Sequence, residues 1–153
     1  MEVYIEEEII MEDLNVKGFA DCIVVDDDEK VYLYDIKTMG AWAWKMKFGR
    51  NPDAEPSIHQ DLQVATYGIG VQRKFKRLDG MYLVYYNKDN STMKQVEVPK
   101  KRMITAKSFW EGVIKNHERG LPSLEENVSP VMDWECRYCE FVDKCKGENN
   151  EWR

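Results

Sequence analysis

Two runs near the N-terminus, at 2–11 and 16–25, are rich in apolar residues that favour β-strands. The polar residues EDLN between them predict a short connection, so we expect an opening hairpin. A third run, KVYLYDIK at 30–37, follows the turn sequence DDDEK and predicts another strand. Residues 80–99 have the same character around NKDN, which predicts a second hairpin.

Two segments have helical periodicity instead. Residues 58–75 place apolar side chains three and four positions apart, and Ser57 followed by Gln60 fits a capping box at the start of that helix. Residues 104–120 predict a second helix that ends at Gly120.

The segment 38–56 shows neither period and predicts a long irregular connection, which in a compact domain is usually functional or disordered. The expected order is three strands, a helix, two strands and a helix. That order predicts an α/β fold, and 153 residues suit a single domain with one core.

Charge and composition narrow the class of protein. The net charge of −6 argues against a protein that binds nucleic acid through global electrostatics, although local basic patches or bound cations can reverse the sign at a contact. The chain has no apolar run of membrane-spanning length. The first ten residues are acidic where a signal peptide would be basic and then apolar, so we expect a cytoplasmic protein without membrane contact.

Two of the expected strands carry charges that need a partner. Asp35 and Lys37 are two residues apart and share a face, and Asp21 can approach them if the strands at 16–25 and 30–37 are neighbours. Two nearby carboxylates favour a shared proton or a divalent cation, and oxygen ligands suit Mg²⁺ or Mn²⁺. A lysine beside them can orient water or neutralise charge on a phosphate. An ordinary salt bridge at a strand end explains the same residues equally well.

On the expected helix, Gln63 and Tyr67 lie four residues apart and form a polar stripe. By themselves they are also consistent with a partly exposed helix flank.

Taken in order, KGFAD, DIK and QVATY resemble the motifs of the PD-(D/E)XK nuclease superfamily, in its RecB-like, CRISPR-associated iron–sulfur exonuclease branch. The resemblance implies a restriction-endonuclease-like mixed central sheet flanked by helices. It also implies a metal-dependent DNA nuclease, an exonuclease acting on single-stranded ends. The implied metal ligands are Asp21, Asp35 and the backbone carbonyl of Ile36; the implied catalytic set is Asp21, Asp35, Lys37, Gln63 and Tyr67.

Three cysteines, Cys136, Cys139 and Cys145, lie within ten residues of one another in the segment 133–147. Such spacing favours a metal or iron–sulfur site over a disulfide framework, although bare cysteines are the alternative. The resemblance implies a [4Fe–4S] cluster, which takes four cysteines, with zinc as the other candidate. Cys22 is the remaining cysteine, and we expect it in the core as a small hydrophobe rather than as a ligand.

In that branch a fourth cysteine and a helix with a further metal ligand usually precede the first strand, and little sequence precedes it here. One of Glu6, Glu7 and Glu8 could substitute for the missing ligand, as could a partner chain or a second copy. The alternative function is a catalytically inactive, nuclease-fold module for nucleic-acid binding or assembly. His59, next to Gln60, and His117 more often correspond to surface histidines than to ligands.

The sequence AWAWKMKFGR interleaves aromatic and basic residues directly after Lys37. Aromatic rings stack on unpaired bases and cations follow phosphates, so this segment is the candidate interface for single-stranded DNA. The residues concerned are Trp42, Trp44, Lys45, Lys47 and Arg50. Equally, the tryptophans could cover the core while the lysines are solvated. Residues 72–77, QRKFKR, could extend a basic rim.

Overall fold

The computed structural model describes residues 1–50, 58–119 and 138–140. Within these residues five strands form one sheet, in the order in which they occur along the chain. The strands are β1 (Glu2–Met11), β2 (Val16–Val25), β3 (Val31–Met39), β4 (Gly80–Asn87) and β5 (Met93–Glu97). Neighbouring strands are antiparallel except β3 and β4, which are parallel. The two predicted hairpins and the third strand are confirmed, and the sheet is mixed.

The helical elements are η1 (Glu12–Leu14), α1 (Ala41–Phe48), α2 (Ile58–Phe75) and α3 (Arg102–Arg119). Both predicted helices are confirmed, the second starting two residues earlier than expected; Ser57 and Gly120 lie outside the described residues. The chain divides into two compact units, with the boundary after Lys107, inside α3. The first of these units holds the sheet. No described helix combines the length and apolar character needed to cross a bilayer.

Helix α1 corrects the expected irregular connection at 38–56. Its Ala, Lys and Met residues favour a helix. None of its side chains is fully buried, so no apolar stripe marks it in the sequence. Its N-cap, Gly40, offers no side chain, and the cap comes instead from the β4–β5 turn, where Asp89 Oδ2 accepts a hydrogen bond from the Ala41 N–H at 2.5 Å. A carboxylate at a helix N-terminus also opposes the positive end of the helix dipole.

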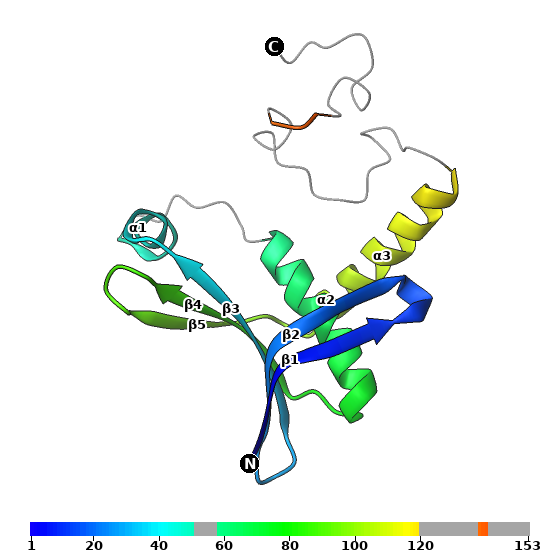
Figure 1. Cartoon of the computed structure of the whole chain (residues 1–153), viewed down its shortest axis with the longest axis horizontal. Helices are drawn as coiled ribbons and strands as arrows, with labels where there is room; N and C mark the ends of the chain where they lie inside the picture. Colours follow the sequence, from blue (N-terminus) through cyan, green and yellow to red (C-terminus); the bar gives the residue numbers. More distant parts are fainter. Residues whose placement is uncertain (51–57, 120–137, 141–153) are drawn as a thin grey trace. The chain divides into compact units, whose positions relative to one another are not determined.

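Helix α2 provides the main cover of the sheet. Its buried residues include Val64, Ala65, Ile69 and Val71, and it contacts β1, β2, β3 and β4. Close approach depends on Gly70, because a Cβ at that position would overlap the side chain of Ile9. In Figure 1, α2 lies between two arms of the sheet, with β1 and β2 on one side and β3, β4 and β5 on the other.

Strand β1 changes the phase of its inward residues at Glu6. Ile9 packs against Gly70 and Glu7 forms an ion pair with Lys74, so both face α2. Toward the N-terminus, the next residue that faces α2 is Tyr4, whose ring contacts Phe75. Tyr4 is three residues from Glu7, whereas regular alternation would give a spacing of two. Glu6 lies within that step and has φ of 50°, a left-handed conformation uncommon for a residue with a side chain.

Strand β2 makes the same change in the same row. Ala20 and Ile23 are both fully buried although they are three residues apart. Asp21 lies between them, opposite Glu6 in a register that continues unchanged on both sides. The hairpin therefore bends as a unit. Pairing between β2 and β3 ends at Cys22 and Tyr34, and Figure 1 shows β2 diverging from β3 beyond their paired part.

The bend also corrects the expected position of Cys22. Because Ile23 takes the inward position, Cys22 turns to the other face of the sheet, where it is only half-buried. Its register partner on that face is Tyr34, which stacks on Tyr82 with 5.2 Å between ring centroids. Burial, and secondarily the charge of Asp21, raises the pKa of the Cys22 thiol.

Candidate active site

The polar residues of interest meet where β2 and β3 separate. Pairing between these strands ends at Cys22 and Tyr34, so the next row would place Asp21 opposite Asp35. There the ladder is replaced by a side chain: the backbone N–H of Ile36 donates to Asp21 Oδ2 at 2.7 Å. β3 meanwhile continues to pair with β4 as far as Met39. The separation of β2 and β3 thus forms a fork that holds the carboxylates of Asp21 and Asp35. The hydrogen bond from the Ile36 N–H to Asp21 spans this fork.

Asp35 is the buried acid of the fork, with 1% of its surface exposed. Its Oδ2 forms an ion pair with Lys37 Nζ at 2.7 Å. Apart from this ion pair, neither carboxylate oxygen accepts a hydrogen bond from the described residues. Burial raises the pKa of Asp35; Lys37 acts in the opposite direction, and the charge of Asp21 raises it further. An under-satisfied buried carboxylate is costly, which makes this position a candidate for cation binding.

Lys37 is held between the sheet and α2. Besides Asp35, its Nζ donates to Gln63 Oε1 at 2.7 Å. Gln63 Nε2 in turn lies 3.5 Å from the Tyr67 hydroxyl, which is a long and weak hydrogen bond. The structure therefore brings the five predicted catalytic residues to one place, since the remaining member, Asp21, bonds to the chain between Asp35 and Lys37.

Gly18, the glycine of the KGFAD motif, allows Tyr67 to approach the backbone of β2 closely. A Cβ at this position would lie 2.8 Å from Cε1 and 3.0 Å from the hydroxyl oxygen of Tyr67. The ring of Tyr67 thus lies directly against the backbone of β2. This close approach fixes the far end of the chain of contacts from Tyr67 through Gln63 to Lys37.

The donor set suits a hard divalent cation. Asp21 and Asp35 supply carboxylate oxygens, the carbonyl of Ile36 lies between Asp35 and Lys37 in the chain, and Mg²⁺ typically binds one or two carboxylates and retains waters. The unsatisfied oxygen of buried Asp35 fits such an ion. The described part of the chain contains no group of three or more His, Cys, Asp or Glu residues arranged for a metal.

The N-terminal acids and the histidines add nothing to this donor set in the structure. Glu7 is paired with Lys74, and Glu8 is paired with Lys17 at 2.6 Å. His59 is exposed in the first turn of α2, and His117 is exposed near the end of α3. Of the cysteine cluster only Cys139 falls within the described residues, where it is exposed; Cys136 and Cys145 lie outside them.

The predicted nucleic-acid residues all lie on or next to α1. Trp42 is 76% exposed, whereas Trp44 is half-buried and packs edge-on against Phe48 at 4.9 Å. Lys45 and Arg50 are exposed and Lys47 is half-buried. Trp42 is therefore available to stack on a base, while Trp44 helps to attach the helix.

The basic run at 72–77 is different, because three of its four cations pair with acids. Arg73 binds Asp13 in a two-point contact at 2.6 and 3.0 Å, and Arg77 binds Asp79 at 2.6 Å. Lys74 pairs with Glu7. We therefore do not include this run in the candidate interface.

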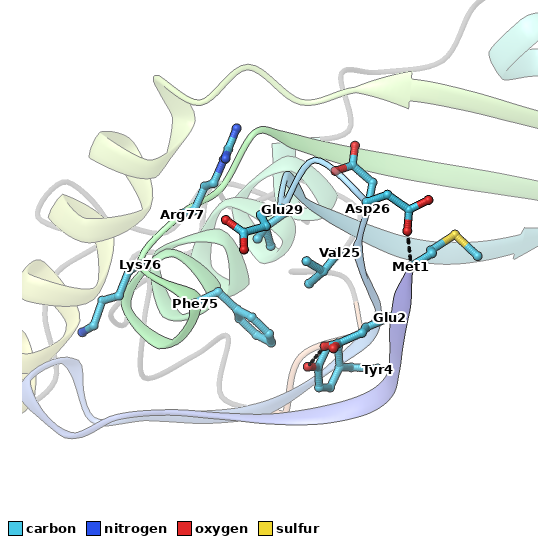
Figure 2. A pocket seen from close by; sticks show the side chains of 11 residues that line it. Met1, Glu2, Tyr4, Val25, Asp26, Glu29, Phe75, Lys76 and Arg77 are labelled. Carbon is cyan, nitrogen blue, oxygen red and sulfur yellow. Dashed lines mark hydrogen bonds and ion pairs between the residues drawn. The ribbon is translucent and has the colours of Figure 1, made fainter.

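A cavity of about 580 Å³ lies at the other end of β3, next to Val31 (Figure 2). Acids contribute much of its lining, with Glu2, Asp26, Asp27 and Glu29 facing Lys76 and Arg77. Tyr4, which also lines it, donates to Glu2 at 2.6 Å. An acidic lining disfavours phosphate, and none of the predicted catalytic residues borders this cavity.

Comparison with known proteins identifies the family of the chain. A family profile described as PD-(D/E)XK nuclease superfamily matches residues 1–146. The chain belongs to the PD-(D/E)XK nuclease superfamily. Its α/β fold, a mixed five-stranded sheet with flanking helices, is consistent with a restriction-endonuclease-like domain.

Among solved structures, this PD-(D/E)XK domain is similar to the one titled "Crystal structure of SSO0001", with a TM-score of 0.50 and 22% sequence identity. The match covers 94% of this chain and 60% of that one, so the chain spans about three fifths of its length. At this identity the likeness concerns the fold. No curated protein sequence matches the chain.

Proposed function

We propose that this domain is a divalent-metal-dependent deoxyribonuclease, a RecB-like exonuclease that hydrolyses phosphodiester bonds at single-stranded DNA ends. The observation that carries the proposal is the fork, where buried Asp35, Asp21 and Lys37 meet beside an unsatisfied carboxylate oxygen. Asp21, Asp35 and the Ile36 carbonyl would hold Mg²⁺ or Mn²⁺. When bound, the ion would polarise the scissile phosphate and make its water more acidic.

Lys37 would supply the positive charge that stabilises negative charge developing on the phosphate. An ammonium group has three N–H donors, and two acceptors, Asp35 and Gln63, engage it here at 2.7 Å each. One donor remains for a water or for a phosphate oxygen, where negative charge grows as water attacks phosphorus and the P–O bond to the leaving group breaks. Gln63 and Tyr67 act as positioning residues, because they hold Lys37 without occupying its third donor.

The substrate strand would leave the fork along α1, with Trp42 as the exposed stacking surface and Lys45, Lys47 and Arg50 contacting phosphates. The segment with Cys136, Cys139 and Cys145 would carry a [4Fe–4S] cluster, or zinc. A second copy or a partner chain could complete this ligand set.

One observation favours the second candidate, a catalytically inactive module that binds nucleic acid. In the described residues the fork has two acids and no third His, Cys, Asp or Glu within reach of a shared ion.

Cleavage assays separate the two candidates. The purified full chain is incubated with end-labelled single- and double-stranded DNA and RNA, with Mg²⁺, with Mn²⁺ or with a chelator. We expect metal-dependent shortening of single-stranded DNA that Asp35→Asn and Lys37→Met abolish, while the exposed controls Asp28→Asn and Lys101→Met retain it. Binding without cleavage in the wild type would favour the inactive module, and cleavage that survives Asp35→Asn would contradict the proposed site.

Elemental analysis of protein purified without oxygen, together with its mass in solution, tests the cysteine segment. Four irons per chain and a visible absorption band support the cluster, and one zinc supports the alternative. Absence of both metals would reject this part of the proposal.

A further inference from the structure

The face of the sheet that points away from α2, here called the outer face, consists mainly of apolar and aromatic side chains. One row across it runs from Ile5 on β1 through Cys22 on β2 and Tyr34 on β3 to Tyr82 on β4. The rings of Tyr34 and Tyr82 stack with 5.2 Å between their centroids. A continuous apolar row therefore crosses four strands.

The rows on both sides of this one have the same character. Toward one end of the strands, Val3 is in register with Val24, and Val24 with Tyr32. Toward the other end, Ile36 is in register with Val84. In the described strands β1 to β4, none of the outward positions of these three rows carries a charge.

This composition is unusual for a sheet face in contact with water, because the solvated positions of a strand are normally polar. The side chains of Val3, Ile5 and Ile36 are nevertheless between 49% and 66% exposed. Helix α2 packs against the opposite face, where Leu33 and Leu83 are buried. The outer face thus has the composition of a buried surface and the exposure of a free one, which indicates that a partner covers it.

The size of the outer face distinguishes between possible partners. Strands about 4.8 Å apart, with outward residues roughly 7 Å apart along each strand, give a face on the order of 500 Å². One helix, about 10 Å in diameter, would cover the width of roughly two strands and leave the others in water. A second sheet would cover the full width. Two such faces together would bury about 1,000 Å², the least that a specific interface requires.

The chemistry of the outer face also favours a second copy. An uncharged face gains nothing from a charged partner, and it would remove water from any charged group that it covered. The same face of another copy is equally uncharged, and a two-fold axis brings identical surfaces together. The tyrosines at 32, 34 and 82 fit this interpretation, because tyrosine is enriched in protein–protein interfaces.

We propose that two copies of this chain associate through their outer faces, with the two sheets packed about 10 Å apart. The inference goes beyond the proposed nuclease function and does not rest on it. Asp35 and Lys37 lie on the side of the sheet that α2 covers, so the two forks would face away from the interface and remain open. The small interface area implies a reversible dimer with a dissociation constant in the micromolar range.

The test compares Ile5→Lys on the outer face with Ile104→Lys on α3, two exposed isoleucines that receive the same charge. Sedimentation velocity of the full chain, kept reduced, measures its mass between about 1 and 200 μM. We expect the wild type to change from monomer to dimer as concentration rises. Ile5→Lys should raise the dissociation constant at least about tenfold, because both lysines would lose water without a carboxylate partner. Ile104→Lys should behave like the wild type.

Met93→Lys is a second disrupting variant, because Met93 is 64% exposed and in register with Tyr86 at the β5 edge of the same face. It should weaken the dimer as Ile5→Lys does. A wild type that stays monomeric at every concentration would overturn the inference, and so would a dimer that both variants leave intact.

Alkylation of Cys22 provides an independent readout at the centre of the outer face, where this thiol is half-buried. Its reaction with iodoacetamide, followed by mass spectrometry of its peptide, should slow as the wild-type concentration rises and stay constant in Ile5→Lys. A wild-type rate independent of concentration would contradict the interface. Neither result bears on the nuclease proposal, because cleavage is measured separately and the fork lies on the opposite face.

Discussion

The carboxylate of Asp21 accepts a hydrogen bond from the backbone N–H of Ile36 at 2.7 Å, in the first row where β2 and β3 no longer pair. One side chain therefore has two tasks. It satisfies a backbone donor that the separated strands leave without a ladder partner, and it brings an acid toward Asp35. The position of Asp21 beside Asp35 and the stability of the fork therefore depend on the same contact.

Asp21→Ala should lower the free energy of unfolding by about 1–2 kcal/mol, because the Ile36 N–H loses a charged acceptor. Asp21→Asn retains an acceptor oxygen and should cost less, although both variants should lose nuclease activity. Urea denaturation followed by circular dichroism measures the difference. An alanine variant as stable as the asparagine variant would show that the hydrogen bond contributes nothing.

Asp35→Asn should stabilise the protein at neutral pH in the presence of a chelator. Because burial raises the folded-state pKa of Asp35 above its ordinary 3.8, its contribution to stability is complete below that value and is lost as pH rises through the folded pKa. At pH 7 the ionised group is therefore unfavourable, and its neutral isostere should raise the melting temperature by a few degrees. Calorimetry across the acidic range, with Asp28→Asn as the control, tests this. A melting temperature below that of the wild type at every pH would contradict it.

If the carboxylate of Asp35 binds a divalent ion, the ion should change the melting temperature of the protein. Mn²⁺ should raise the melting temperature of the wild type and not that of Asp35→Asn, and the effect should weaken as pH falls, since proton and ion compete for one group. An equal rise in both proteins would indicate that the ion binds elsewhere.

Gly18→Ala should lower activity through Tyr67. The new Cβ would lie 2.8 Å from the ring, so the ring or the strand must shift, at a cost of roughly 1–3 kcal/mol. Because Tyr67 supports Gln63 and through it Lys37, kcat should fall more than KM rises. In a double-mutant cycle Tyr67→Ala should remove most of the stability cost of Gly18→Ala, and strict additivity of the two would disprove the contact.

Glu6→Gly should increase stability by roughly 1 kcal/mol, because glycine adopts the observed φ of 50° without the strain that a Cβ causes. Glu8→Gly is the comparison variant: the same replacement in ordinary extended backbone, which also removes the exposed ion pair with Lys17, should destabilise the protein. Thermal denaturation of both variants provides the measurement, and a loss of stability in both would indicate that Glu6 is unstrained.

Local patterns predicted most of the fold. The alternation in β3 and the helical spacing of α2 each have a period that burial on one side imposes, and β1 and β2 are rich in residues that favour strands. The site residues became visible because Asp35 and Lys37 are charges in a strand whose other inward residues are apolar.

What sequence reasoning missed depends on contacts between distant residues. Helix α1 lacks a buried stripe and receives its cap from Asp89, 48 residues away. The left-handed backbone at Glu6 has no glycine or asparagine to mark it.

The bend shared by β1 and β2 limits how this hairpin can change in length. In both strands the residues that face α2 change from one set of alternate positions to the other at the row of Glu6 and Asp21. Paired residues of β1 and β2 therefore face the same side of the sheet on both sides of that row. A single insertion or deletion in one strand would expose half of its core residues while the other strand kept its own orientation. Length variation is therefore confined to paired changes, one in each strand, or to the connection at η1, where no pairing has to be preserved.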